Sequence, residues 1–506
     1  MSQTGRFAHM TLAELLADKW LPTDAGQIEV TGLALDHRQL QPGDVFIAVP
    51  GTAQDGRAYI DAAINAGAAA VLKQADTAEE TIVWRGQVPL IPFEKLAEKI
   101  SAIAGEFYGK PSVQAHVIGV TGTNGKSTCT HLLAQLNSRL GLPSAVMGTL
   151  GYGLVNASSN RLENLKETGL TTADAIATQR ILAELIRDGA QSVAMEVSSH
   201  SLEQHRVAAV NFETAIFTNL SRDHLDYHGD MASYARAKQR LFRFSSLKHR
   251  IINWDDDVGR RLAAVPHPSA KTWTYSLSDP AAHIYVKRFI QNEDGIVAEL
   301  ESCWGKGTLR SSLIGHFNLS NLLAVVVTGC IAGVSLEYVL ETVANLQTVA
   351  GRMEKVGNGQ SINVVVDYAH TPDGLEKALL ALREHTKGNL YCIFGCGGDR
   401  DKGKRPLMAA IAEQLADCVV VTSDNPRGEL PAEIIADIRR GFADLSKVKE
   451  IEDRGEAINY CIKRAQTGDC VLIAGKGHED YQLIGDNRLP FSDVKHARLA
   501  LRDRDD

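Results

Sequence analysis

The sequence has no long hydrophobic run and no excess of positive charge. Its most apolar stretch, Leu322–Val334, is too short to span a bilayer and contains glycine. Residues 1–20 show no basic segment followed by an unbroken apolar core, so we expect no signal peptide. The formal net charge of −8 argues against a broad nucleic-acid-binding surface. We therefore expect a cytoplasmic protein that acts on small molecules and contacts neither nucleic acid nor membrane.

Cysteine is sparse and scattered. Of the 8 cysteines, Cys392 and Cys396 lie close together, but no second Cys or His pair completes a zinc pattern. Reduced thiols in a cytosolic protein are the expectation. No short-period repeat, low-complexity tract or coiled coil is visible. A chain of 506 residues with 44% hydrophobic and 23% charged residues is typical of a soluble protein with two to four domains, and we expect a monomer.

One glycine-rich segment has the features of a phosphate-binding loop. Gly122-Thr123-Asn124-Gly125-Lys126-Ser127-Thr128 follows the apolar residues 117–119 and precedes a helical pattern of leucines at 132, 133, 136 and 140. Between a strand and a helix, the N–H groups of such a turn face an anion, a lysine neutralises it, and a hydroxyl binds Mg²⁺. Val120 stands where the general P-loop pattern has its first glycine. A surface turn would need neither the lysine nor the paired hydroxyls.

The alternation of apolar runs and helical patterns predicts an α/β protein with three domains. We expect a small mixed α/β N-terminal domain over 1–110, a central P-loop-type parallel-sheet ATPase domain over 111–350, and a C-terminal Rossmann-like domain over 351–506. A linker is expected at 109–112. The expected strands are 45–49, 69–72, 192–197, 214–218, 364–367, 390–394, 419–421 and 471–474, and a helix is expected over 59–66.

Three polar residues in the central segment complement the loop. Glu196 ends an apolar strand, His224 lies in the loop after the next strand, and Lys238 lies in an amphipathic pattern over 234–242. Glu196 is a hard oxygen ligand suited to Mg²⁺, and a neutral His224 is a less usual one. Taken singly, the two could be a capping acid and a loop histidine. Beside a phosphate loop, the metal interpretation is favoured.

The last segment places glycine and charge after three strands. The loops are 394–406, which is dense in glycine and cations, then Asp424-Asn425-Pro426-Arg427, then Gly475-Lys476-Gly477-His478-Glu479. Loops at one edge of a parallel sheet would form a pocket with both charge signs, which suits a zwitterion. Three solvated charged loops are the alternative. Glycine at each strand exit favours close backbone approach.

These motifs resemble the Mur ligase family of peptidoglycan synthesis over nearly the whole chain. The metal segment is similar at Met195–His200, the nucleotide signatures at Gly315–Asn318 and Gly351–Glu354, and the C-terminal ATP loop at Asp367–Pro372. The resemblance implies that Lys126, Glu196, His224 and Lys238 are catalytic. It implies an ATP site that adds Asn318, Arg352, Asp367 and His370 to the loop 122–128. It also implies Mg²⁺ ligands Ser127, Glu196, His224 and Lys238, the last as a carbamate derived from CO₂.

The loop at 424–427 resembles the branch of the family that adds meso-diaminopimelate to UDP-N-acetylmuramoyl-L-alanyl-D-glutamate. The resemblance implies that diaminopimelate is held by Arg400, Asp424, Asn425, Pro426, Arg427, Gly475 and Glu479. It implies that the UDP-dipeptide is held by Leu35, Arg38, Thr171, Thr172, Ser199, His205 and Arg206. His37 departs from the pattern, which has a serine before the arginine.

The resemblance implies an ATP-dependent, ADP-forming amide ligase that works through an acyl phosphate. A lysine-adding member and a folylpolyglutamate-synthase-like ligase are the nearest alternatives, and the loop at 424–427 argues against both. A P-loop switch that uses ATP only for conformation belongs to a different class. ADP release that depends strictly on the amino acid separates a ligase from a switch.

Overall fold

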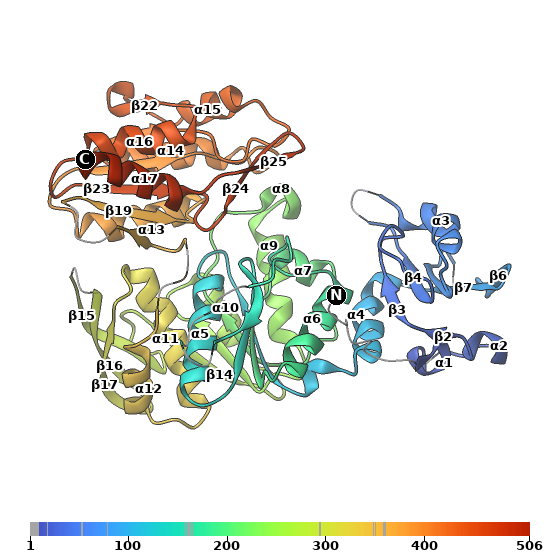
Figure 1. Ribbon diagram of the computed structural model, residues 1–506. Coiled ribbons are helices and arrows are strands. Elements are labelled where there is room, and N and C mark those ends of the chain that lie inside the picture. The colour runs from blue at the N-terminus through green and yellow to red at the C-terminus, as the bar shows by residue number, and fades with distance from the viewer. Residues whose placement is uncertain are drawn as a thin grey trace. The chain divides into compact units, whose positions relative to one another are not determined.

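The chain forms three α/β domains, each built on its own β-sheet (Figure 1). The computed structural model describes residues 10–505 except 18, 52–53, 78, 157–158, 160–161, 163–164, 293–294, 348, 350 and 358–360. By the density of contacts the chain groups into two compact units. The first contains the residues up to 119 together with 142–215 and 240–248, and the second contains 120–141, 216–239 and the residues from 249 onward.

The N-terminal domain is a five-stranded sheet in the order β3-β4-β5-β7-β6. All neighbouring strands are parallel except the edge strand β6, which runs antiparallel to β7. The buried residues Val45 and Ile47 of β4 pack with Leu96 and Ile100 of α4, because alternate residues of a strand share a face. The elements are β1 (Met10–Thr11), α1 (Leu12–Leu15), α2 (Thr23–Gly26), β2 (Glu29–Val30), β3 (Gly32–Ala34), β4 (Asp44–Ala48), η1 (Gly56–Tyr59), α3 (Ile60–Asn65), β5 (Ala70–Gln74), β6 (Val83–Arg85), β7 (Val88–Phe93), α4 (Leu96–Phe107) and η2 (Pro111–Val113).

The central domain is a ten-stranded sheet in the order β10-β9-β11-β8-β12-β13-β14-β15-β16-β17. The expected parallel pairing is present between β9 and β11 and between β13 and β14. The elements are β8 (His116–Thr121), α5 (Lys126–Arg139), β9 (Ser144–Gly148), β10 (Gly151–Leu154), α6 (Ala175–Arg187), β11 (Ser192–Glu196), α7 (Ser199–Glu203), β12 (Phe212–Phe217), α8 (Leu225–His228), α9 (Met231–Gln239), η3 (Arg240–Arg243), β13 (His249–Asn253), α10 (Asp257–Ala264), β14 (Lys271–Ser276), β15 (Ile284–Asn292), β16 (Gly295–Ser302), β17 (Gly305–Ser311), α11 (His316–Ile331) and α12 (Leu336–Val343).

Both edges of this sheet differ from the expected alternation of strand and helix. At one edge, β10 follows β9 without a helix and pairs antiparallel with it. Strands β15, β16 and β17 follow one another without a helix and pair antiparallel. Buried and partly buried residues alternate along most of β16, as in a strand with only one face on a core. Antiparallel strands need only a short connection, so no crossover helix is required here.

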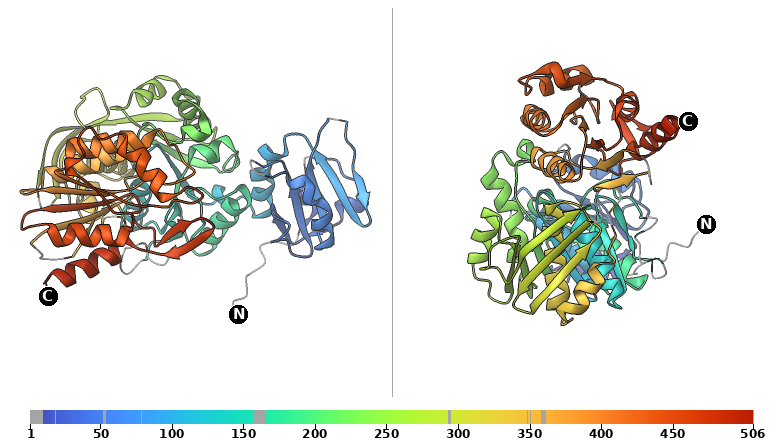
Figure 2. Two further views of the ribbon diagram at one scale, coloured as in Figure 1. Left: turned by 90° about the horizontal axis from the view of Figure 1, so that it is seen from above. Right: turned by 90° about the vertical axis from the view of Figure 1, so that its left-hand side faces the viewer.

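The C-terminal domain is a six-stranded sheet in the order β18-β19-β23-β20-β21-β22, parallel except for β18. Helices α13, α14 and α15 pack on one face and α16 and α17 on the other (Figure 2). The carboxyl ends of β23, β20 and β21 therefore lie side by side, as expected for the three charged loops. The elements are β18 (Glu354–Val356), β19 (Asn363–Asp367), α13 (Pro372–Arg383), β20 (Leu390–Phe394), α14 (Lys404–Leu415), β21 (Cys418–Val421), α15 (Pro431–Arg439), η4 (Leu445–Lys447), β22 (Val448–Glu450), α16 (Arg454–Arg464), β23 (Cys470–Ala474), β24 (Tyr481–Ile484), β25 (Asn487–Pro490) and α17 (Asp493–Asp505).

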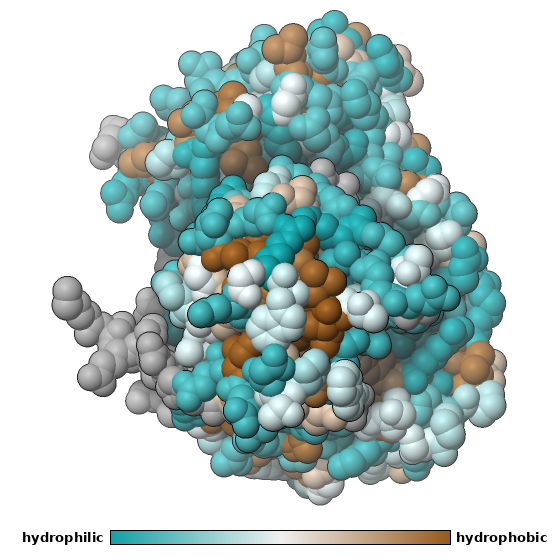
Figure 3. Space-filling model, turned by 90° about the vertical axis from the view of Figure 1, so that its right-hand side faces the viewer, coloured by the Kyte–Doolittle hydropathy of each residue, from teal (hydrophilic) through white to brown (hydrophobic). Residues whose placement is uncertain are grey.

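Large apolar side chains are exposed on the N-terminal domain. Trp20 is 82% exposed, Val83 57% and Trp84 38%. Figure 3 shows apolar residues gathered on the face of this domain that is turned toward the viewer. Within the part of the chain that the structure describes, no helix is both long enough and apolar enough to cross a membrane.

A fully buried ion pair in the C-terminal domain gives a prediction about stability. Arg454 at the start of α16 donates from Nε and Nη2 to the two oxygens of Asp493, at 2.7 and 2.8 Å, and neither side chain is exposed. Removing one partner leaves an uncompensated buried charge, so we expect Asp493→Ala to lower the free energy of unfolding by about 3–5 kcal/mol. Calorimetric melting would measure this. Asp503→Ala, on the exposed side of the same helix, is the matched control.

Candidate active site

The loop between β8 and α5 has the backbone of an anion-binding turn. Gly122 and Gly125 have φ angles of 155° and 87°, in a region that disfavours other residues. A side chain at Gly122 would lie 1.9 Å from Thr218 Oγ1, and one at Gly125 would lie 2.5 Å from Asn321 Oδ1. Glycine is therefore required at both positions. Gly125 precedes the first residue of α5, so the positive end of the helix dipole faces the loop.

Two lysines converge on this loop. Lys126 Nζ donates to the carbonyls of Gly122 and Thr123 at 3.0 and 2.9 Å, and Lys238 Nζ donates to the Gly122 carbonyl at 2.7 Å. Lys238 is buried on α9, and its ammonium lies 4.5 Å from the centre of the Tyr234 ring. Burial, assisted by the charge of Lys126, lowers the pKa of Lys238 well below its ordinary value. A neutral amine is thereby favoured at Lys238.

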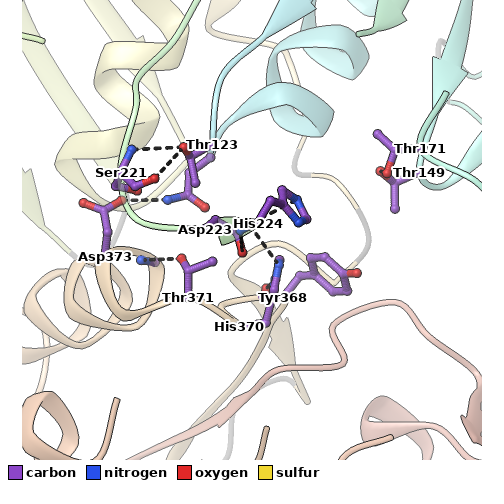
Figure 4. Close-up of polar contacts among 12 residues, drawn as sticks. Thr123, Thr149, Thr171, Ser221, Asp223, His224, Tyr368, His370, Thr371 and Asp373 are labelled. Carbon is purple, nitrogen blue, oxygen red and sulfur yellow. Dashed lines mark hydrogen bonds and ion pairs between the residues drawn. The ribbon is translucent and has the colours of Figure 1, made fainter. Parts of the chain in front are cut away.

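Side chains from two other segments fix the shape of the loop (Figure 4). Thr123 Oγ1 donates to the Ser221 carbonyl at 3.1 Å and accepts from the Ser221 N–H at 3.0 Å. The Asn124 side-chain amide donates to Asp373 at 2.6 Å, on the first turn of α13. The phosphate loop and the C-terminal ATP loop predicted at 367–372 are therefore linked within the second unit.

Arg352 connects further predicted nucleotide residues to the helix α5. Its Nη2 donates to Ser127 Oγ at 3.1 Å, and its guanidinium carbon lies 4.5 Å from the centre of the Tyr368 ring. Asp367 accepts a hydrogen bond from the Met353 N–H at 2.7 Å, and burial raises the pKa of Asp367 above its ordinary value. Asn318, on the first turn of α11, donates to the Ile314 carbonyl at 2.7 Å.

His224 and His370 share one carboxylate. Asp223 Oδ2 lies 3.3 Å from His224 Nε2 and 4.0 Å from His370 Nε2 (Figure 4). Burial opposes ionisation of Asp223, but neighbouring cationic side chains, chiefly His224, outweigh it and lower the pKa of Asp223 to about 2. Burial and the charge of Lys404 lower the pKa of His370 to about 4. Asp223 is therefore ionised at neutral pH and lies beside both imidazoles, while His370 Nδ1 is held at 2.9 Å from the Tyr368 carbonyl.

Glu196 lies in the first unit, at the end of β11, and has its own set of partners. Its Oε1 accepts from the Thr149 N–H at 2.9 Å, and its Oε2 accepts from Thr149 Oγ1 at 3.2 Å. A side chain at Gly148 would lie 2.2 Å from Glu196 Oε1, so this position must stay small. Thr149 Oγ1 also lies at hydrogen-bond distance from Thr171 Oγ1, 3.1 Å away, and accepts from the Thr171 hydroxyl when its own proton goes to Glu196. The carboxylate is thus held in one orientation beside a predicted substrate residue.

Thr172 and Arg206 belong to the same cluster. The Thr172 hydroxyl donates to the Glu196 carbonyl at 2.9 Å, and Arg206 Nη1 donates to the Thr172 carbonyl at 2.9 Å. The side chain of Gln204, which sequence reasoning did not select, accepts from Arg206 Nε at 2.9 Å. Ser199 is buried at the first position of α7. His205 is separate from this cluster and lines a cavity with residues of η3.

The residues predicted for the uridine end follow β3 in the N-terminal domain. Arg38 forms an ion pair with Asp36 at 2.7 Å, and its side chain is 78% exposed. His37, the residue that departs from the family pattern, stacks on Tyr59 with ring centres 4.7 Å apart. Leu35 packs at the margin of the domain core. Leu35 and Arg38 both lie in the segment that directly follows the end of β3 (Gly32–Ala34).

The charged loops of the C-terminal domain meet in a compact set of residues, which we call the C-terminal polar cluster: Asp424, Asn425, Arg427, Lys476 and Glu479. Lys476 is fully buried, and its Nζ lies 3.0 Å from Glu479 Oε2, 3.0 Å from Asn425 Oδ1 and 3.5 Å from Asp424 Oδ1. Asn425 donates to Glu479 Oε2 at 2.8 Å. Burial raises the pKa of Glu479 above its ordinary value, against the opposing charge of Lys476. Sequence reasoning missed Lys476, although a lysine between two glycines after a strand was a usable signal.

Arg427 is held by backbone alone. Its Nη1 donates to the carbonyls of Gly398 and Asn425 at 3.0 and 3.4 Å, and within the described residues no carboxylate lies at ion-pair distance from it. Its φ of 51° is left-handed, and backbone bonds to Leu483 and Gly485 of the β24–β25 hairpin secure it. Arg400 is exposed and donates to the Asp399 carbonyl at 2.9 Å. A side chain at Gly475 would lie 2.9 Å from Asp424 Oδ2, so this backbone approaches closely, as predicted.

The residues around loop 122–128 fit a Mg²⁺ ion that is bound together with a phosphorylated substrate. Among the residues described, no three His, Cys, Asp or Glu side chains could hold a metal ion together. Mg²⁺ is commonly held by one or two carboxylates with waters and substrate phosphates, and the buried hydroxyl of Ser127 stands at the start of α5. The residues present therefore fit a metal that arrives with a nucleotide.

Comparison with known proteins identifies the family. The chain matches the Mur ligase middle domain over residues 120–329, the glutamate ligase domain of Mur ligases over 351–477, and the Mur ligase family catalytic domain over 29–108. It is 51% identical over 483 residues to the UDP-N-acetylmuramoyl-L-alanyl-D-glutamate–2,6-diaminopimelate ligase of Ectopseudomonas mendocina, covering 95% of this chain and 97% of that protein.

Two further relatives carry the same description. The protein of Pseudomonas aeruginosa is 53% identical over 469 residues, covering 93% of this chain and 94% of the relative. A solved structure of a UDP-N-acetylmuramoyl-L-alanyl-D-glutamate–2,6-diaminopimelate ligase is 37% identical, with a TM-score of 0.69, and covers 99% of this chain and 100% of its own. The matches span all three sheets and the loops between them, and the chain belongs to the Mur ligase family.

Proposed function

We propose that this protein is the ligase that adds meso-2,6-diaminopimelate to the D-glutamate γ-carboxyl of UDP-N-acetylmuramoyl-L-alanyl-D-glutamate, with ATP converted to ADP and phosphate. One observation in the C-terminal polar cluster carries the choice of amino acid. Asp424 Oδ1 is buried and accepts no hydrogen bond from the described residues, with Lys476 Nζ 3.5 Å away, while Arg427 has no carboxylate at ion-pair distance among them. Each end of diaminopimelate carries one ammonium and one carboxylate group. The Asp424 carboxylate would bind the ammonium group, and the Arg427 guanidinium would bind the carboxylate group.

The chemistry proceeds in two steps. The γ-carboxylate of the substrate glutamate attacks the γ-phosphorus of ATP, which gives an acyl phosphate and releases ADP. The neutral amine of diaminopimelate then attacks the acyl carbon, loses a proton, and displaces inorganic phosphate as the amide forms. Positioning and charge neutralisation carry most of such catalysis. Lys126 neutralises the transferring phosphoryl group, and the N–H groups of loop 122–128 hold the phosphates.

ATP contacts and metal contacts divide among the residues already described. We assign four further residues to the ATP site: Asn318, Arg352, Asp367 and His370. Two contacts support this assignment, since Arg352 donates a hydrogen bond to Ser127 next to the phosphate loop, and His370 lies beside Asp223 together with His224. Ser127, Glu196, His224 and Lys238 would hold Mg²⁺, with Lys238 as a carbamate that supplies a further anionic oxygen. Bound Mg²⁺ offsets negative charge on the phosphates. The neutral amine favoured at Lys238 is the form that captures CO₂.

The remaining assignments are to the other substrates. Glu196, Thr149, Thr171, Thr172 and Arg206 form one hydrogen-bonded cluster, which supports placing the muramoyl dipeptide there. Leu35 and Arg38 would contact the uridine end. We assign residues 1–110 to UDP binding, 111–350 to ATP binding and 351–506 to amino-acid binding, in a cytoplasmic monomer without nucleic-acid or membrane contacts.

ADP release with single amino acids tests the proposed reaction. With ATP, Mg²⁺ and the UDP-dipeptide present, we expect ADP release with meso-diaminopimelate and very little with L-lysine or L-glutamate. A preference for lysine would assign the protein to the lysine-adding branch. A preference for glutamate with a folate acceptor would indicate a folylpolyglutamate-synthase-like ligase. ADP release that is independent of any amino acid would indicate a switch.

Replacing Arg427 tests how the second carboxylate is recognised. Diaminopimelate differs from lysine by a carboxylate at the far end of the side chain, and a site built around a polar contact can reject an analogue lacking it by about 10⁴-fold. We expect Arg427→Ala to raise the Michaelis constant for diaminopimelate by about 10²-fold or more, with that for ATP little changed. The variant need not gain activity with lysine. Removing Arg427 abolishes the cost of leaving its charge unpaired when lysine is bound, but it creates no new contacts for lysine.

The control for this variant is Arg440→Ala, because Arg440 is an exposed arginine whose ion pair with Asp437 lies on the surface. Its Michaelis constants are expected to match the wild type. An Arg427→Ala enzyme with an unchanged constant for diaminopimelate would show that Arg427 does not bind the distal carboxylate.

A further inference from the structure

A cavity of about 370 Å³ lies in the first unit, on the segment that follows α7. Its apolar wall includes Leu202, Val207 and Phe244, and its polar groups include His205, Arg240 and Arg243. Ligand sites commonly enclose about 300–1,000 Å³ and combine a mostly apolar lining with a few convergent polar groups. The volume of this cavity falls within that range, and its lining combines apolar side chains with convergent polar ones.

The polar groups of the cavity leave one positive charge uncompensated. Arg240 pairs with Glu203 at 2.8 Å and also donates to the Leu202 carbonyl at 3.3 Å. The side chains of Arg243 and His205 make no hydrogen bond or ion pair with any described residue. One carboxylate thus faces two guanidinium groups. The cavity is matched in charge to a ligand that carries a single negative charge.

The backbone at His205 separates this cavity from the predicted substrate cluster. His205 has a φ of 56°, a left-handed conformation that is uncommon for a residue other than glycine. The next residue, Arg206, donates to the Thr172 carbonyl and does not line the cavity. His205 therefore lines the cavity, whereas the next residue, Arg206, belongs to the hydrogen-bonded cluster with Glu196 and Thr172. The cavity is not a part of that cluster.

We propose that this cavity binds a small organic anion with one carboxylate on an apolar or ring-shaped body. The Arg243 guanidinium would receive the carboxylate through two parallel hydrogen bonds, with His205 as a further donor. Leu202, Val207 and Phe244 would contact the apolar body. The site lies outside the residues assigned to ATP, to diaminopimelate and to the UDP-dipeptide, apart from His205, whose assignment to the dipeptide it replaces.

Ligand-observed fluorine NMR on the full-length protein tests the proposal, with 4-fluorobenzoate as the anionic probe and 4-fluorobenzyl alcohol as its neutral match. A probe of this size with ordinary ligand efficiency binds with a Kd of about 1–10 mM. We expect saturable broadening of the benzoate signal and at least about 10-fold weaker binding of the alcohol. Arg243→Ala, at an exposed rim position, is expected to weaken benzoate binding by at least about 10-fold.

Two space-filling variants locate the binding site. Ala208→Trp and Ser245→Trp place a large ring at exposed positions that line the cavity, and each is expected to abolish saturable binding. Arg261→Ala, an exposed arginine on α10, is the matched control and is expected to bind benzoate as the wild type does. Melting curves of all variants confirm that each is folded. The proposal is overturned by a wild type without saturable binding, by binding that survives in both tryptophan variants, or by equal binding of the neutral probe.

Discussion

Replacing Lys126 with alanine is expected to reduce ADP release by about 10²- to 10³-fold or more, while the protein stays folded. In the proposed mechanism Lys126 neutralises charge that develops on the transferring phosphoryl group, and loss of one such preorganised interaction costs about this factor in other enzymes. In the structure Lys126 Nζ is already held over the loop by the carbonyls of Gly122 and Thr123, so the charge is in place before nucleotide binds. The measurement is the steady-state rate of ADP formation with all three substrates saturating.

The control must separate loss of charge from loss of structure. Lys126→Ala removes two hydrogen bonds to loop carbonyls, but the Lys126 side chain is only half-buried and contributes no apolar core packing. Its far-ultraviolet circular dichroism and melting midpoint are therefore expected to stay near those of the wild type. Lys271→Ala, at an exposed position on β14, is the matched lysine variant and is expected to be fully active. Near-normal ADP release from folded Lys126→Ala would remove this residue from the mechanism.

Replacing Lys238 is expected to have an effect of similar size for a different reason. If the buried amine carries CO₂ as a carbamate, Lys238→Ala removes an anionic oxygen ligand, and we expect a loss of about 10³-fold in ADP release. Small carboxylic acids such as acetate or formate are expected to restore part of the activity, because they can supply the missing oxygens in the space left by the side chain. Lys238→Arg is expected to stay inactive, since a guanidinium offers no neutral amine.

A spectroscopic signature distinguishes this chemistry from a structural role of the same lysine. Wild-type protein equilibrated with ¹³C-bicarbonate is expected to show one carbamate carbon resonance that is absent from Lys238→Ala. Lys126→Ala, which retains Lys238, is expected to keep that resonance. A fully active Lys238→Arg enzyme, or a wild type without the resonance at saturating bicarbonate, would refute the carbamate.

The parallel parts of the fold follow from local sequence patterns. Continuous apolar runs such as 390–394 and 471–474 are typical of strands buried on both faces, and the structure has β20 and β23 at these positions with helices on each side. Because parallel strands end at one edge, the charged loops could be expected to meet even before the strand order was known. The antiparallel strands β15–β17 were not predicted, because buried residues alternate with less buried ones, as along most of β16, and this pattern gives a weaker signal than a continuous apolar run.

Sequence reasoning selected residues of the candidate site where a motif marks them. It did not select residues that are brought to the site only by tertiary contacts. Gly122, Gly125 and Lys126 stand in a recognisable order between a strand and a helix. The β24–β25 hairpin, which secures Arg427 and Asn425 through Leu483 and Gly485, has no motif of its own. The same holds for Asp223, whose role depends on His370 lying 4.0 Å away although 147 positions separate the two in sequence (370 − 223 = 147).

The C-terminal polar cluster is electroneutral, since Lys476 and Arg427 balance Asp424 and Glu479. Diaminopimelate carries two ammonium and two carboxylate groups at neutral pH. If it binds in this cluster as proposed, it would leave the balance of charge unchanged, whereas lysine would introduce a net positive charge into a largely buried site. Discrimination between the two amino acids would then have a component that belongs to the sum of the charges rather than to any single contact. A variant that removes one of these charges shifts the preferred net charge of the ligand by one unit, and a lysine-adding enzyme built on this fold would need one more acid or one fewer base here.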